Sequence, residues 1–293
     1  MSQEHIDPKV YELYDEYCHS GMSRRDFLSR AAALSVAGGS ALAMAEALLP
    51  DYASAQEVSF TDDRIKANYV EYPSPGGTSG EMRGYLVEPD GEGPFPAVLV
   101  VHENRGLNPY IEDVARRAAV AGFLALAPDG LAPVGGYPGN DDDGKAMQAS
   151  LDPQELFADM HNSAKFLKIH SLSTGKLGAT GFCYGGGVVN QLAVVMGREL
   201  NAGVPFYGRA PATGDVDFIE APMMIQYAEE DPRINAMQAE YEAALKAGNK
   251  PYVMHTYPGT RHGFHNYSTP RYNPEQAAVA WERTLAYFNE HLA

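Results

Sequence analysis

Short apolar runs alternate with longer amphipathic segments from residue 58 to the end of the chain. Residues 96–101 are continuously apolar and rich in β-branched side chains, which is typical of a central strand buried on both faces. Residues 110–122 carry apolar side chains at helical spacing. Strands that alternate with helices indicate a parallel sheet covered on both faces. Further strands are predicted over 123–127, 175–180, 202–207, 223–227 and 252–257, and further helices over 152–170, 188–196, 234–247 and 274–292.

Two more strands, 65–72 and 82–87, come before this alternating region. The turn-rich segment 73–80 separates them, so they are predicted to form an antiparallel hairpin. The predicted fold class is therefore α/β, with a mostly parallel, doubly wound sheet that opens with an antiparallel hairpin.

Residues 131–144 are rich in Gly, Pro and Asp and predict a surface loop or the rim of a lid. The run Asp141-Asp142-Asp143-Gly144 resembles part of a calcium-binding loop. In the EF-hand register, Gly139 would be the first ligand and Ser150 the twelfth, where a glutamate is needed. We therefore expect no metal at this loop.

Composition narrows the class of protein. The chain has 293 residues, of which 45% are hydrophobic, so it is long enough for one large globular domain. Its net charge of −16 argues against nucleic acid or an anionic membrane surface as a partner. A homo-oligomer is compatible with this composition.

The first 55 residues differ from the rest. Ser23-Arg24-Arg25-Asp26-Phe27-Leu28 resembles a twin-arginine export signal, and Ala53-Ser54-Ala55 matches an A-x-A cleavage pattern. The apolar run between them contains Glu46 and two glycines, so it predicts no membrane span. We predict a signal over residues 1–55 and a periplasmic or secreted protein. The alternative is a helical arm, retained in a cytoplasmic protein and packed on the body or on a neighbouring subunit.

The chain has two cysteines, Cys18 and Cys183. Because Cys18 precedes the predicted cleavage site, the mature protein would hold a single thiol and no intramolecular disulfide. An exported protein with one thiol is consistent with a cysteine kept for chemistry.

Gly181-Phe182-Cys183-Tyr184-Gly185 lies between a predicted strand and a predicted helix. This is the context of the nucleophile elbow G-x-S-x-G, with cysteine in the place of serine. The strained turn has no room for side chains at Gly181 and Gly185, and it lifts the sulfur of Cys183 toward substrate. The alternative is that Cys183 is a small buried hydrophobic residue.

A cysteine nucleophile needs a base, and the base needs a group that orients it. The loops after two later strands carry Glu229, Glu230 and Asp231, and then His262. The order nucleophile, acid, histidine is that of α/β-hydrolase triads. Asp231 is the preferred acid because Asp-Pro begins the turn into the next helix, and Glu229 and Glu230 remain alternatives. His265 is the competing histidine, or a pocket wall.

An oxyanion hole is expected from backbone N–H groups. One candidate is the N–H of Tyr184, directly after the nucleophile. The other is the N–H of Asn104, in the loop after the strand at 96–101.

Three motifs together resemble the dienelactone hydrolase family: 102–106 (His-Glu-Asn-Arg-Gly), 181–186 (Gly-Phe-Cys-Tyr-Gly-Gly) and 261–264 (Arg-His-Gly-Phe). The resemblance covers roughly residues 60–293 and identifies 56–293 as an α/β-hydrolase domain. It implies a Cys-Asp-His triad that opens lactones or esters through an acyl-thiolate intermediate, without cofactor or metal. It also implies that Glu103 contacts the thiol and keeps it protonated until substrate arrives.

The chain departs from the family at the residues expected to hold a substrate carboxylate. The family places an arginine shortly after the catalytic histidine, and Asn266 stands there in this sequence. Arg105, Arg209 and Arg271 are candidates to replace it, and Tyr207 is a further candidate substrate contact. The departure puts a dienelactone substrate in doubt but leaves the reaction class intact.

Two other functions compete with an esterase or lactonase. One is a ligand-binding protein on a retired hydrolase scaffold, against which the intact trio argues. The other is a thiol redox sensor, which often uses a resolving cysteine that the mature chain would lack.

Overall fold

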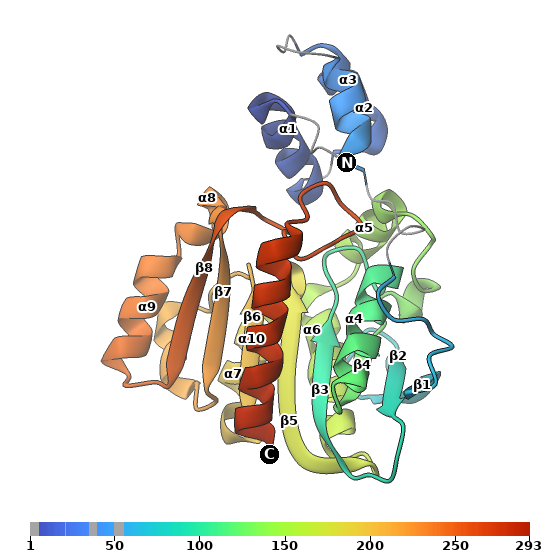
Figure 1. Ribbon diagram of the computed structural model, residues 1–293, viewed down its shortest axis with the longest axis vertical. Coiled ribbons are helices and arrows are strands. Elements are labelled where there is room, and N and C mark those ends of the chain that lie inside the picture. The colour runs from blue at the N-terminus through green and yellow to red at the C-terminus, as the bar shows by residue number, and fades with distance from the viewer. Residues whose placement is uncertain (1–5, 21, 35–39, 50–55) are drawn as a thin grey trace.

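The computed structural model describes residues 6–20, 22–34, 40–49 and 56–293. An eight-stranded sheet in the order β1-β2-β4-β3-β5-β6-β7-β8 forms the centre of the molecule (Figure 1). β1 and β2 form the antiparallel hairpin, β2 is antiparallel to β4, and all later neighbours are parallel. The predicted fold class is confirmed. The strands are β1 (Ile65–Ser74), β2 (Gly80–Pro89), β3 (Phe95–Val101), β4 (Leu124–Pro128), β5 (Ser173–Phe182), β6 (Ala202–Phe206), β7 (Met223–Glu230) and β8 (Tyr252–Arg261).

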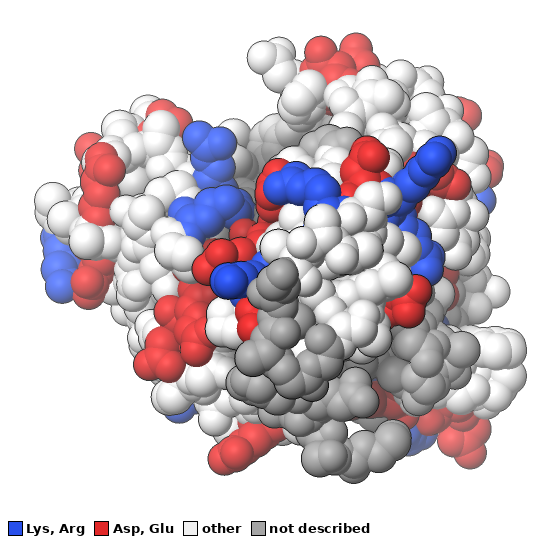
Figure 2. All heavy atoms as spheres, turned by 90° about the horizontal axis from the view of Figure 1, so that it is seen from above, with Lys and Arg blue, Asp and Glu red and all other residues white. Residues whose placement is uncertain are grey.

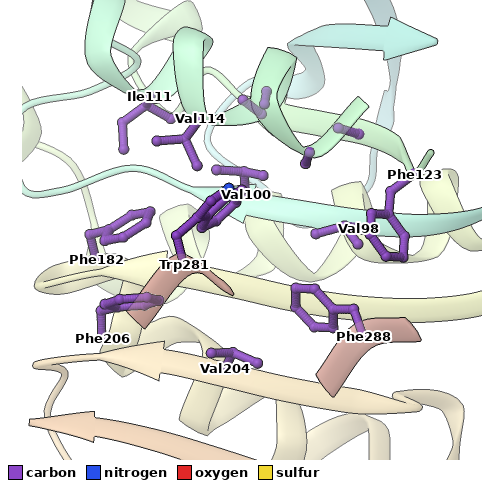
Figure 3. Packing of buried hydrophobic residues seen from close by; sticks show 14 of the residues in the cluster. Val98, Val100, Ile111, Val114, Phe123, Phe182, Val204, Phe206, Trp281 and Phe288 are labelled. Atoms are coloured by element: carbon purple, nitrogen blue, oxygen red, sulfur yellow. The ribbon is translucent and has the colours of Figure 1, made fainter. Parts of the chain in front are cut away.

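Helices cover both faces of the sheet. Successive side chains of a strand point to opposite faces, so β3 supplies Val98 and Val100 to one core and Leu99 and Val101 to the other. The first core packs under α4 (Pro109–Val120) and α10 (Pro274–Leu292), and Trp281 of α10 lies in it (Figure 3). The second packs under α6 (Pro153–Lys168), α7 (Tyr184–Met196), α8 (Pro232–Asn235) and α9 (Gln238–Ala247).

Two predicted boundaries were wrong. The segment 131–144 is only partly a loop, because η1 (Ala132–Val134) lies in it and α5 (Asp141–Ala149) begins within it. Asn140 caps α5 by accepting a hydrogen bond from the N–H of Asp143, and acidic residues are favourable in a first helical turn. The helix predicted over 234–247 is divided into α8 and α9. Two more short helices are η2 (Gly197–Glu199) and η3 (Thr213–Phe218).

A small helical unit stands over the carboxyl ends of the parallel strands (Figure 1). It contains α1 (Pro8–His19), α2 (Arg24–Ala32) and α3 (Ala41–Ala47), and we call its described residues, 6–20, 22–34 and 40–49, the N-terminal arm. The arm has a hydrophobic cluster of its own, in which Phe27 of the twin-arginine-like motif is fully buried. The predicted cleavage motif at 53–55 lies outside the described residues. Within the described part of the chain, no helix is both long enough and apolar enough to cross a membrane.

Candidate active site

Cys183 occupies a single-residue turn between β5 and α7. Its backbone has φ 56° and ψ −110°, a conformation that costs free energy for any residue with a side chain. A Cβ on Gly181 would overlap the backbone of Gly185, and a Cβ on Gly185 would overlap the carbonyl of Val101. The two glycines therefore let the strand and helix approach closely enough to hold the turn, as the motif predicts.

Asp231 and His262 form a buried pair beside this turn. Nδ1 of His262 lies 2.5 Å from Oδ2 of Asp231, and each residue is only 4% exposed. Asp231 also accepts a hydrogen bond of 3.3 Å from the N–H of Ile234 at the start of α8. The two alternative acids lie elsewhere, since Glu229 accepts from the N–H of Gly259 and Glu230 pairs with an arginine.

The imidazole of His262 interacts with the sulfur of Cys183 as well. Burial acts to lower the pKa of His262, but the charge interaction with Cys183 and the hydrogen bonds to Asp231 and Cys183 raise it above the ordinary value. Burial acts to raise the pKa of Asp231, and its hydrogen bond and charge interaction with His262 lower it on balance. The geometry can therefore hold an imidazolium between sulfur and carboxylate.

Glu103 follows β3 and is 5% exposed. Burial raises the pKa of this carboxyl, and the charge interaction with Cys183 raises it further, against the opposing effect of Arg105. Nδ2 of Asn266 donates a hydrogen bond of 2.9 Å to Oε2 of Glu103. The structure thus brings Glu103 into the electrostatic neighbourhood of the thiol.

Two residues expected to contact substrate lie below the site instead. Asn266 is 1% exposed, and its Oδ1 accepts hydrogen bonds from the backbone and hydroxyl of Ser268, so the side chain supports Glu103. His265 is 1% exposed, stacks on Phe182 and shares a 2.7 Å hydrogen bond with Tyr110. Burial lowers the pKa of His265 well below its ordinary value, so it is a neutral core residue. Both side chains are buried for the same reason: the loop after His262 turns inward, beneath the elbow.

The three candidate arginines have different surroundings. Arg209 is exposed on the wall of the cavity that holds Cys183. Arg105 is 4% exposed and forms an ion pair with Asp141 of α5. The guanidinium of Arg271 lies over the ring of Tyr14, 4.8 Å from its centre. Of the three, Arg209 alone faces this cavity.

A cavity of about 980 Å³ opens at the carboxyl ends of the strands, and the half-buried Cys183 is part of its wall. Tyr184 and Asn104, the candidate oxyanion residues, lie on the same wall. Tyr184 is the first residue of α7, so its N–H has no acceptor within the helix. Tyr207 also lines the cavity, with its ring 4.8 Å from that of His262. The remaining wall is contributed mainly by Pro153, Phe157, Val188, Gln191, Asp215, Arg233, Ile234, Met237, Glu240 and Tyr241.

Comparisons with known proteins cover both parts of the chain. The model of the dienelactone hydrolase family matches residues 82–292, and a model described as YqhI-like matches residues 1–36. A "Probable 2-oxo-3-(5-oxofuran-2-ylidene)propanoate lactonase" of Bradyrhizobium sp. is 32% identical over 233 residues, which are 74% of this chain and 92% of the relative. A "Putative hydrolase fragment YghX" of Escherichia coli is 64% identical over 114 residues, 39% of this chain and 97% of the fragment. The crystal structure of a "Putative Dienelactone Hydrolase" from Klebsiella pneumoniae superposes with a TM-score of 0.67 at 27% identity, covering 77% of this chain and 99% of that one.

Proposed function

The chain belongs to the dienelactone hydrolase family and is a hydrolase similar to its lactonases, and we propose that it cleaves a small ester or lactone through a covalent intermediate on Cys183. The observation that carries the proposal is the convergence of Cys183, His262 and Asp231. These residues are far apart in the sequence, yet the imidazole interacts with both the sulfur and the carboxylate.

In the first half of the reaction, His262 takes the proton of the thiol and the sulfur of Cys183 attacks the substrate carbonyl. The new S–C bond places the electron pair of the carbonyl on oxygen, where the N–H groups of Tyr184 and Asn104 stabilise it. The electron pair returns, the C–O bond to the alcohol breaks, and His262 gives its proton to the departing oxygen. In a lactone, that oxygen stays attached to the acyl group.

In the second half, a water molecule gives a proton to His262 and its oxygen attacks the thioester carbon. Collapse of this intermediate breaks the S–C bond, releases the acid and returns the proton to Cys183. Asp231 keeps the imidazole in the tautomer that presents its other nitrogen to sulfur, and it stabilises the imidazolium in both halves.

Glu103 has the role of controlling when the thiolate forms. A carboxylate in the electrostatic neighbourhood of a sulfur opposes the second negative charge that a thiolate would bring. We assign the resting state to a protonated thiol held by this repulsion, with activation when substrate displaces the carboxylate from the sulfur.

The cavity wall favours a substrate with little net charge. Two arginines, Arg209 and Arg233, and two acidic residues, Asp215 and Glu240, line it, so their formal charges cancel. The rest of the wall is largely apolar. Because Asn266 is committed to Glu103, no cation occupies the family's carboxylate-binding position. We therefore propose a neutral ester or lactone in preference to an acidic one.

The direct test is hydrolysis of a panel of p-nitrophenyl esters and neutral lactones by wild type and by Cys183→Ala. The variant is expected to lose roughly a thousandfold or more in kcat while it remains folded. Intact mass spectrometry after rapid acid quenching should show one acyl group on the wild type and none on the variant. Wild-type turnover by Cys183→Ala would refute the proposal, and ligand binding without turnover by either protein would favour a binding function.

A further inference from the structure

The carboxyl-terminal end of α1 rests on the loop that follows β3. The side-chain amide of Asn104 donates a hydrogen bond of 2.9 Å to the carbonyl oxygen of Cys18, and Nη2 of Arg105 lies 3.1 Å from the sulfur of Cys18. Cys18 is 2% exposed. The arm therefore contacts the two residues that directly follow Glu103, in the loop that supplies a candidate oxyanion N–H.

α5 holds the same end of α1 from the side. Nζ of Lys145 donates hydrogen bonds to two carbonyl oxygens of the arm, 2.5 Å to Tyr17 and 3.1 Å to Met22. The hydroxyl of Tyr17 donates to the carboxylate of Asp142. The ammonium of Lys145 also lies 4.4 Å from the centre of the Tyr17 ring, within the range of a cation–π interaction.

The middle of α1 lies beside His262. The rings of Tyr11 and Tyr14 meet the guanidinium groups of Arg261 and Arg271 at 4.4 Å and 4.8 Å. A second cavity of about 370 Å³ lies between these residues and the buried pair of Asp231 and His262. The helix is thus the outer wall on the histidine side of the centre.

Seen from above, basic and acidic side chains are interspersed over this end of the molecule, and neither sign dominates (Figure 2). No described residue of the arm lines the main cavity, and Cys183 remains part of that cavity's wall. The arm consequently covers the histidine side and leaves the approach to the sulfur open.

We propose that α1 is a fixed cap of the catalytic centre, which holds the loop of Glu103, Asn104 and Arg105 in its working position. The inference rests on the proposed function of that centre. Cys18, Tyr17 and Lys145 are positioning residues, since they act through the loop and touch no reacting atom. With the cap undocked, Asn104 loses its hydrogen bond to the carbonyl of Cys18, and the N–H of Asn104 moves relative to the oxyanion.

The test uses the full chain with Lys145→Met, which keeps the aliphatic stem and removes the donors. Lys168→Met is the matched control, because Lys168 also bridges two backbone carbonyls, those of Gly175 and Glu199, at 2.9 Å each and away from the site.

Each protein is treated with iodoacetamide, and peptide mass spectrometry measures labelling of Cys18 and Cys183 separately. Lys145→Met should label Cys18 about tenfold faster than wild type, because opening of the arm exposes it. Its kcat for ester hydrolysis should fall roughly tenfold with little change in KM, since a displaced loop weakens transition-state binding. Lys168→Met should match wild type in both measurements.

Three results would overturn the proposal. Faster labelling of Cys18 with an unchanged kcat would show that the cap has no catalytic role. Protection of Cys18 in both Lys145→Met and Lys145→Glu would show that the arm is not held in this way. If wild type hydrolyses none of the esters, the proposed function fails, and the cap is then tested separately by the alkylation of Cys183. Its labelling rate should change at least threefold on undocking, because Glu103 moves with the loop, and an unchanged rate would refute the cap as well.

Discussion

The amide of Asn266 holds the carboxyl of Glu103 with a hydrogen bond of 2.9 Å between Nδ2 and Oε2. Both side chains are almost fully buried. A neutral amide orients the carboxyl without adding a positive charge, so the electrostatic effect of Glu103 on Cys183 is preserved. The relationship makes Asn266 a support of the Glu103 carboxyl.

Replacement of Asn266 by leucine should therefore reduce both stability and activity. Leucine cannot donate to Oε2 of Glu103, and a buried acceptor left without a donor costs about 1–3 kcal/mol of unfolding free energy. Asn201→Leu is the matched control, because Asn201 accepts a hydrogen bond of 2.8 Å from the N–H of Leu177 far from the site. Urea unfolding should show a lower free energy of unfolding in both variants than in wild type, and kcat/KM should fall only in Asn266→Leu. An equal kcat/KM in the two variants would contradict the support of Glu103.

Replacement of Glu103 by glutamine should make the thiol of Cys183 more reactive at neutral pH. The amide is similar in size and removes the negative charge that opposes thiolate formation. We expect the rate of Cys183 alkylation by iodoacetamide at pH 7 to rise several-fold, while ester turnover falls. Peptide mass spectrometry separates Cys183 from Cys18. A slower alkylation in the variant would mean that Glu103 assists deprotonation in the resting state.

The Asp231–His262 pair should give a characteristic dependence of stability on pH. The pKa of His262 is raised on folding, so its contribution to stability is fully present below its unfolded pKa, about 6.5, and is lost as the pH rises through the folded value. The pKa of Asp231 is lowered, so its contribution is present above its unfolded pKa, about 3.9, and is lost as the pH falls through the folded value. The difference in unfolding free energy between wild type and His262→Gln should be larger at pH 5.5 than at pH 8.5. Denaturant titration at the two pH values measures it, and a difference that grows toward pH 8.5 would have the wrong sign.

The glycines of the elbow should differ sharply in their tolerance of alanine. A Cβ at Gly185 overlaps the carbonyl of Val101, whereas a Cβ at Gly187 meets atoms of Arg209 no closer than 3.6 Å, which are ordinary contacts. Gly185→Ala should lose about 3 kcal/mol or more or fail to fold, and Gly187→Ala should gain up to about 1 kcal/mol from helix propensity. Thermal unfolding of the two variants measures this difference, and equal melting temperatures would show that the turn is not tightly packed.

Whether the active protein retains its N-terminal arm tests both the predicted export signal and the proposed cap. Cleavage after Ala55 would remove Cys18 and every contact of α1, so the proposed cap requires the active protein to retain its first helix. Mass spectrometry of the purified, active protein should find peptides containing Tyr17 and Cys18. An active protein that begins at Gln56 would restore the export prediction and remove the cap. Until that measurement, the twin-arginine signal stays a prediction.

The sequence was most informative where a feature depends on residues close together in the chain. The alternation of Val98, Leu99 and Val100 between two cores, and the glycines around Cys183, follow from local periodicity and turn sterics. Sequence order identified Asp231 and His262 because a parallel sheet collects its loops at one edge. The role of Asn266 could not be found in this way, since its partner lies 163 residues earlier.

The docking of α1 could not be predicted from the sequence pattern, for the same reason. Cys18 and Asn104 are 86 residues apart, and their hydrogen bond uses a backbone carbonyl, which leaves no mark on residue type. α5 was missed because a run of three aspartates is usually read as solvated loop. Its acidic first turn and the cap at Asn140 were the signals that could have identified it.

The only tryptophan of the chain, Trp281, packs 5.7 Å from His265, which itself stacks on Phe182 at the base of the elbow. Its indole also lies beneath the guanidinium of Arg117. Tryptophan fluorescence of the native protein therefore comes from one position in the core, linked to the residue before Cys183 through the ring of His265. Emission from that indole can follow unfolding of the centre, and the proposed acylation of Cys183, in real time and without a label.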